Sequence, residues 1–161
     1  MVSAPVLAAA AASSIAVATD LRHRRIPNWL TGGTLAAGLL MNVWLTGLDG
    51  GLTALLGAGL GFFMLVPLYA LRAMGAGDVK LLAALGGLLG PRDLVSIAVY
   101  GAIVGGAISL VVMLRCGILT RALRAALLGH VPSLRTGITA PYALAIAGGV
   151  YLAQVLPPVL R

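Results

Sequence analysis

The sequence predicts an all-α protein, a polytopic membrane bundle of about six transmembrane helices with an amphipathic helix in one cytoplasmic loop. Of its residues, 60% are hydrophobic and only 9% are charged, and the mean hydropathy is +1.05, far from the composition of soluble domains. The apolar residues fall into runs of helical length that short polar or basic segments separate. Because a span needs roughly 20 residues, 161 residues suit one compact bundle, and we predict a single membrane domain over residues 1–161.

The first predicted span covers residues 4–20, an Ala-rich apolar run that ends at Asp20 before a basic cluster at 22–25. A cleaved signal peptide is the alternative, because Ala16-Val17-Ala18 resembles a small-residue cleavage site. A signal peptide carries positive charge before its apolar region, whereas the charge here comes after it. We therefore expect a span.

The second and third spans are predicted at 29–46 and 52–72, joined by a turn at 48–51. Pro27 ends any helix before it, and Asn28 can cap the helix that follows. Pro67 predicts a kink in the third span.

The fourth span, from Asp78 to Leu89, is short. Its 12 to 14 residues give roughly 20 Å of helix against a hydrocarbon core of about 30 Å, so Asp78 is expected below the headgroups. A fifth span at 94–114 follows a turn in which Asp93 is the expected N-cap.

Basic residues among apolar ones in Arg115–Thr139 predict an amphipathic helix on an anionic membrane surface. Thr139 and Pro141 predict the start of a sixth span, which ends near Leu156.

Basic residues accumulate on one side of this predicted topology. Of the 11 Lys and Arg residues, nine lie in the segments expected at one membrane face and two in those at the other face. This positive-inside bias places both termini outside the cytoplasm. The net charge of +7 therefore reflects topology and the lipid bilayer, and we predict no nucleic-acid partner. Small residues four apart, at Gly57/Gly61, Gly86/Gly90 and Gly101/Gly105, predict close helix packing.

Neither a metal nor another cofactor is predicted. The chain has a single cysteine, Cys116, and His23 and His130 lie in basic loops without ligand spacing around them. The sequence contains no GxSxG motif, so it gives little support to hydrolysis by a catalytic serine.

The candidate chemistry lies in two acids, Asp20 and Asp78. Two complete spans separate them, so both return to the same membrane face, the basic cytoplasmic one. An acid in a membrane segment is costly, by roughly 2.5 to 3.5 kcal/mol, and is functional by default. Two carboxylates that approach closely share one proton, so that one can activate water as a general base while the other acts as an acid.

Structural roles for the same acids remain open at this point. Asp20 could cap a helix end or pair with Arg24, and Asp78 could be an N-cap with Lys80 nearby.

The combined motifs resemble those of type IV prepilin peptidases. These motifs are Asp20 with Arg24–Asn28 (RRIPN) after the first span, and Gly75–Lys80 (GAGDVK, a GxGD element) at the start of the fourth. GxGD is shared with presenilin-like intramembrane aspartyl proteases, and the paired Asp and IPN element makes the resemblance more specific. The length is most similar to that of the short TadV/CpaA branch, which serves tight-adherence (Flp) pilus systems.

This resemblance implies cleavage of prepilins or pseudopilins in the bacterial inner membrane, after a Gly that ends a short basic leader. Asp20 and Asp78 match the family's catalytic pair. Gly75 and Gly77 lack Cβ atoms, so they can take turn conformations and let another chain segment approach closely, and we expect them to shape the approach to Asp78. Lys80 is expected to adjust the charge of Asp78, and Pro27 and Asn28 to end and cap helices. The cysteine-based metal region of larger relatives has no counterpart here, so methyltransferase activity is not expected. Other pilus assembly components are possible partners.

Two other classes of function stay open. A small transporter or ion-conducting subunit would use the acids to bind cations or relay protons, and would place acids deep in several spans. A non-catalytic scaffold of a secretion or pilus system would tolerate the loss of both acids.

Overall fold

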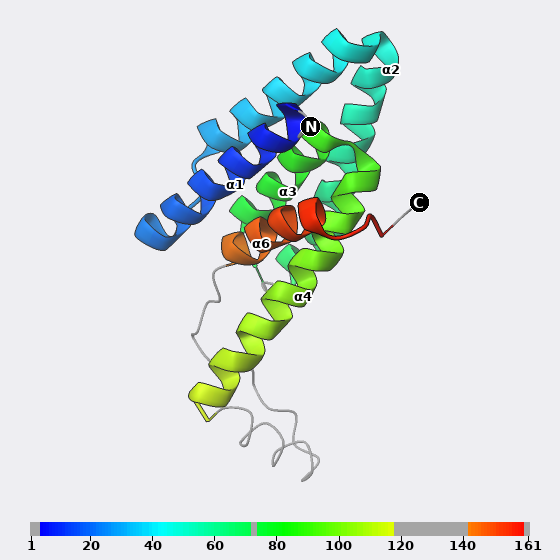
Figure 1. The fold of residues 1–161 in the computed structure, drawn as a ribbon. Helices are drawn as coiled ribbons and strands as arrows, with labels where there is room; N and C mark the ends of the chain where they lie inside the picture. The colour runs from blue at the N-terminus through cyan, green and yellow to red at the C-terminus, as the bar shows by residue number, and fades with distance from the viewer. Residues whose placement is uncertain (1–3, 72–73, 118–141, 160–161) are drawn as a thin grey trace.

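The computed structural model describes residues 4–71, 74–117 and 142–159, and every regular element in them is a helix. Figure 1 shows these helices packed side by side, with the C-terminal half of α4 extending away from the others. The helices are α1 (Ala4–His23), α2 (Asn28–Ala70), α3 (Ala76–Leu89), α4 (Pro91–Arg115) and α6 (Tyr142–Val155).

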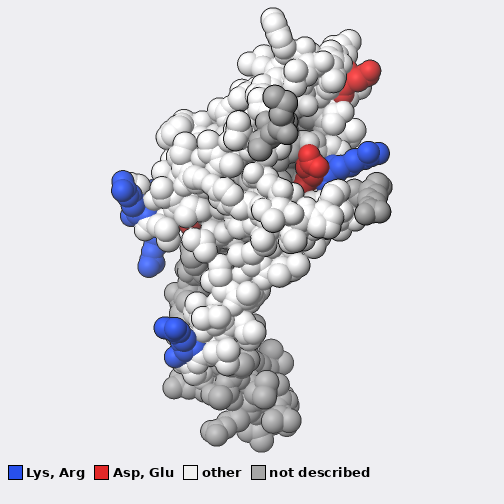
Figure 2. Space-filling model, in the orientation of Figure 1, with Lys and Arg blue, Asp and Glu red and all other residues white. Residues whose placement is uncertain are grey.

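Three of these helices, α1, α2 and α4, are long and apolar enough to cross a membrane. Large apolar side chains cover their outer surfaces; Trp44, for example, is 90% exposed and Phe63 72% exposed. Most of the visible surface carries no charge (Figure 2). A surface of this kind is stable in lipid, which agrees with the expected membrane protein.

Helix α2 is a hairpin of two helical halves and includes the predicted second and third spans. Its chain doubles back at Gly47, whose backbone angles are φ 69° and ψ −147° (Figure 1). Only glycine adopts such angles without steric cost. The predicted turn at 48–51 is therefore wrong, because these residues are helical and one glycine reverses the chain. Pro67 lies inside the second half, where the backbone stays helical.

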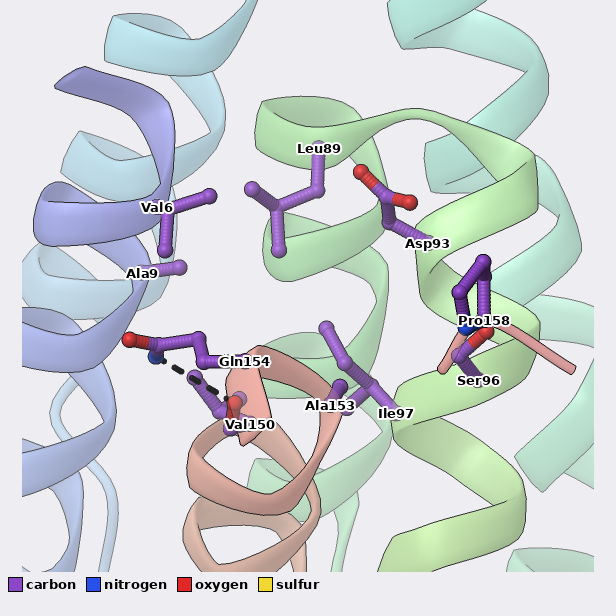
Figure 3. Close-up of a pocket in the computed structure, with 10 residues that line it drawn as sticks. All are labelled: Val6, Ala9, Leu89, Asp93, Ser96, Ile97, Val150, Ala153, Gln154 and Pro158. Carbon is purple, nitrogen blue, oxygen red and sulfur yellow. Dashed lines mark hydrogen bonds between the residues drawn. The ribbon is translucent and has the colours of Figure 1, made fainter. Parts of the chain in front are cut away.

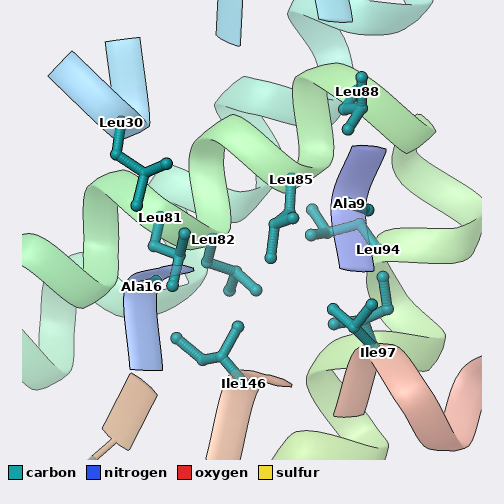
Figure 4. Packing of buried hydrophobic residues seen from close by; sticks show 11 residues of the cluster. Ala9, Ala16, Leu30, Leu81, Leu82, Leu85, Leu88, Leu94, Ile97 and Ile146 are labelled. Atoms are coloured by element: carbon teal, nitrogen blue, oxygen red, sulfur yellow. The ribbon is translucent and has the colours of Figure 1, made fainter. Parts of the chain in front are cut away.

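Helix α3 packs between the two halves of α2 and forms the centre of the bundle. The first half approaches it at Gly38, where a Cβ would overlap the backbone of Leu88. The second half approaches at Gly57, where a Cβ would overlap the carbonyl of Gly86. The inward side chains of α3 meet α1, α4 and α6 in one apolar core (Figure 4). This core contains Ala9, Ala16, Leu30, Leu81, Leu82, Leu85, Leu88, Leu94, Ile97, Ile146 and Val150.

Helices α4 and α6 form a second close pair. A Cβ on Gly101 would lie 3.2 Å from the carbonyl oxygen of Ala145, and one on Gly105 would lie 3.0 Å from the Ala145 Cβ. Gly57 and Gly61 of α2 likewise approach the backbone of α3, so these contacts confirm that the spaced glycines serve helix packing. Gly90 differs, because it ends α3 with a φ of 84°.

The helix ends differ from the prediction in three places. Helix α1 continues to His23, so Asp20 lies within it rather than at its end. Pro27, not Asn28, is the N-cap residue of α2. Gly90 is the N-cap residue of α4, which places Asp93 in the first turn. At the starts of α2 and α4, the cap position is held by the neighbouring Pro27 or Gly90 rather than by the polar residue.

Most of the amphipathic helix expected at 115–139, and the expected start of the sixth span at Thr139 and Pro141, lie outside the described residues. Helix α6 ends at Val155, one residue before the predicted end, and is followed by Pro157 and Pro158.

Candidate functional site

A cleft of about 480 Å³ lies where the end of α1, the connection 24–27 and the starts of α2 and α3 come together. All seven residues that the sequence motifs single out line it. The complete lining is Asp20, Arg24, Arg25, Ile26, Pro27, Asn28, Gly75, Ala76, Gly77, Asp78 and Lys80.

Asp78 is the third residue of α3 and is 8% exposed. Its Oδ2 accepts a hydrogen bond from the backbone N–H of Gly75 at 3.3 Å, and its own N–H donates to the Gly75 carbonyl at 3.2 Å. The free N–H groups of a helix start favour an acid at this position. Gly75 is the N-cap residue, so the alternative of Asp78 as N-cap does not hold. Its Oδ1 has no hydrogen bond to any described residue, and Asp78 lines the cleft.

Asp20 approaches the same cleft from the last turns of α1 and is partly buried. The backbone N–H of Arg24 donates to its carbonyl oxygen at 2.7 Å, and the Arg24 side chain acts electrostatically on its carboxylate. Arg24 has a φ of 50°, which turns the chain toward α2. The two carboxylates also interact electrostatically with each other. The structure thus brings together the two acids that lie 58 positions apart in the sequence.

The two glycines of the GxGD element do not have the turn conformations expected from the sequence. Among the described residues, the glycines with positive φ are Gly47, Gly90 and Gly117, whereas Gly75 has a φ of −81°. Gly77 does allow the expected close approach of another segment, because a Cβ there would lie 3.1 Å from the Cβ of Ile26.

Lys80 and Asn28 form a contact that the sequence analysis missed. The Lys80 Nζ donates a hydrogen bond to the Asn28 Oδ1 at 2.9 Å, across 52 positions of sequence. Asn28 therefore binds another helix instead of capping its own. The only sign of this contact in the sequence is that each of the two residues belongs to a motif next to one of the two acids, Asp20 or Asp78.

A second cavity, of about 380 Å³, lies between α1, α4 and α6 (Figure 3). Its lining includes a single acid, Asp93, together with the polar residues Ser96 and Gln154, so it offers no pair of carboxylates. The Gln154 Nε2 already donates to the carbonyl of Val150 at 3.2 Å. In the described part of the chain, no group of three or more His, Cys, Asp or Glu side chains is placed to hold a metal ion.

The cleft can therefore support chemistry that needs two neighbouring carboxyl groups, such as hydrolysis by activated water. Comparison with known proteins points the same way. Residues 7–110 match the type IV leader peptidase family, and this range includes both acids. No curated protein and no solved structure gave a match.

Proposed function

Because the chain belongs to the type IV leader peptidase family, we propose that it is a membrane aspartyl endopeptidase of prepilins. Its substrates are Flp-like prepilins or pseudopilins, which it cuts after the Gly that ends their short basic leader. The observation that carries this proposal is the presence of Asp20 and Asp78 in one cleft at the ends of α1 and α3.

In the proposed reaction the two carboxyl groups hold one proton between them. The ionised carboxylate removes a proton from a water molecule, whose oxygen attacks the carbonyl carbon of the scissile peptide bond. The protonated partner polarises the carbonyl oxygen, and the leaving nitrogen then receives a proton as the C–N bond breaks. The products are a leader with a free carboxylate and a mature pilin with a new amino terminus.

The position of the cleft suits such a substrate. Arg24, Arg25 and Lys80 line it, and the positive-inside rule places a basic end of this kind at the cytoplasmic face. A basic leader would remain on that side while the apolar helix that follows it stays in the bilayer. In this proposal both termini of the enzyme lie outside the cytoplasm, in the bacterial inner membrane, and methylation of the new amino terminus is not part of its activity.

The proposal is tested by co-expressing the protein with an Flp-like prepilin and analysing the pilin by mass spectrometry. The expected product begins with the residue directly after the leader Gly and has an unmethylated amino group. A prepilin whose leader Gly is replaced by a bulky residue is the matched control and should stay uncut. An uncut wild-type prepilin, in membranes that contain the folded enzyme, would contradict the proposal.

A further inference from the structure

The hydrogen bond between Asn28 and Lys80 joins the two sides of the cleft. Asn28 is the first residue of α2, and Lys80 lies two residues after Asp78 on α3. We propose that this bond is a positioning contact that holds the Asp20 side of the cleft at its working distance from the Asp78 side. This inference rests on the proposed peptidase function.

On one side, the connection from Asp20 to Asn28 is short and tied down at both ends. The N–H of Arg24 donates to the carbonyl of Asp20 at 2.7 Å, and the N–H of Leu30 donates to the carbonyl of Pro27 at 3.1 Å. Only residues 24–27 separate α1 from α2. Because few dihedral angles in this connection are free to change, a contact that fixes Asn28 also restricts the movement of the end of α1, where Asp20 lies.

On the other side, Lys80 belongs to the most deeply buried helix. Its neighbours Val79 and Leu81 are 3% and 0% exposed, and Asp78 precedes them in the same helical turn. The Cα of Lys80 therefore has a fixed position relative to Asp78. A residue that binds the Lys80 side chain is held in place relative to that acid.

The bond is not needed to hold α2 and α3 together. The glycine contacts of Gly38 with Leu88 and of Gly57 with Gly86 already pack these helices. At the far end of α3, the Asn42 Nδ2 donates to the carbonyls of Gly87 at 3.3 Å and Leu88 at 3.2 Å. Asn28 and Lys80 are both exposed, so their bond buries no polar group that demands a partner. Its effect is thus local to the cleft.

Asn42 provides a matched control for Asn28. Both are asparagines in the first half of α2 with a side-chain bond to α3, but Asn42 lies 14 residues further along, which is about 21 Å of helix. Asn42→Ala removes a bond between the same helices far from the cleft. We expect it to lower Tm and to leave kcat of the folded protein unchanged.

The test measures kcat, KM and Tm of purified enzyme in proteoliposomes with a purified Flp-like prepilin. Asn28→Ala and Lys80→Met should each lower kcat about tenfold, with little change in KM, since they misplace the acids rather than weaken substrate binding. The double variant should be no slower than either single variant, because both remove the same bond. Lys80→Arg keeps a donor and a charge, and should recover most of the activity.

The positioning role is overturned if Asn28→Ala keeps the wild-type kcat, or if the effects of the two single variants multiply in the double variant. A loss of kcat in Lys80→Met but not in Asn28→Ala would also overturn the positioning role, because Lys80 would then act without Asn28. These outcomes leave the proposed function intact. An inactive wild-type enzyme, by contrast, would remove the proposed function and the positioning role with it.

Discussion

Gly77 faces Ile26 so closely that a Cβ on Gly77 would lie 3.1 Å from the Cβ of Ile26. This contact sets how near the connection 24–27 comes to the start of α3, and both segments line the cleft. The second glycine of the GxGD element is therefore required for space, not for an unusual backbone conformation.

Gly77→Ala should therefore reduce cleavage more than Gly75→Ala. The added methyl group at residue 77 pushes Ile26 away by a few tenths of an ångström and widens the cleft, for which we expect a loss in kcat of about tenfold. At residue 75 a Cβ would have its nearest neighbour, the Asp78 Oδ2, at 3.5 Å, an ordinary contact. Initial rates of the two variants in proteoliposomes make the comparison, and a greater loss for Gly75→Ala would contradict it.

The packing of α2 on α3 gives a second prediction. Gly57→Ala places a methyl group on the carbonyl of Gly86 and should destabilise the protein by about 1 to 3 kcal/mol, the usual range for overpacking. Gly59→Ala, two residues away on α2, meets nothing within 4 Å and should be neutral or slightly stabilising. Thermal unfolding in detergent measures both, and equal Tm values for the two variants would show that the helices are not packed as described.

The shared proton predicts a bell-shaped dependence of cleavage rate on pH. Raising the pH removes the proton that the acid must supply, and lowering the pH protonates the carboxylate that must activate water. The rate should therefore fall on both sides of an optimum. The two apparent pKa values of such a profile would belong to the pair of carboxyl groups rather than to Asp20 or Asp78 alone. A rate that stays flat at both extremes of pH, with the enzyme still folded, would exclude a one-proton dyad.

The sequence predicts the shared location of the two acids because that location depends on topology alone. Two spans between Asp20 and Asp78 return the chain to the same face, whatever the details of packing. The helical class and the packing role of the glycines follow from composition and spacing in the same way.

Other features depend on three-dimensional neighbours and leave no local signal. Asn is common at helix caps, which predicts that role for Asn28, but the partner of its side chain is Lys80 on another helix. The sequence predicts the chain reversal at 48–51 rather than at Gly47, because nothing in an apolar, Gly-rich run marks which glycine takes positive φ. The role of Gly77 depends on Ile26, which only the folded chain brings near.

The dyad itself is tested most directly by comparing single Asp→Asn variants. Asn keeps the shape of the side chain but cannot exchange the proton, so Asp20→Asn and Asp78→Asn should each lower prepilin cleavage by a factor on the order of 10² to 10⁴. Asp49→Asn and Asp93→Asn are matched controls, because neither residue lines the cleft, and they should cleave at the wild-type rate.

The measurement is the fraction of co-expressed prepilin processed in membranes with equal amounts of each variant. Loss of processing in Asp20→Asn and Asp78→Asn alone is the result that the account predicts. Near wild-type processing by either of these two variants would contradict it.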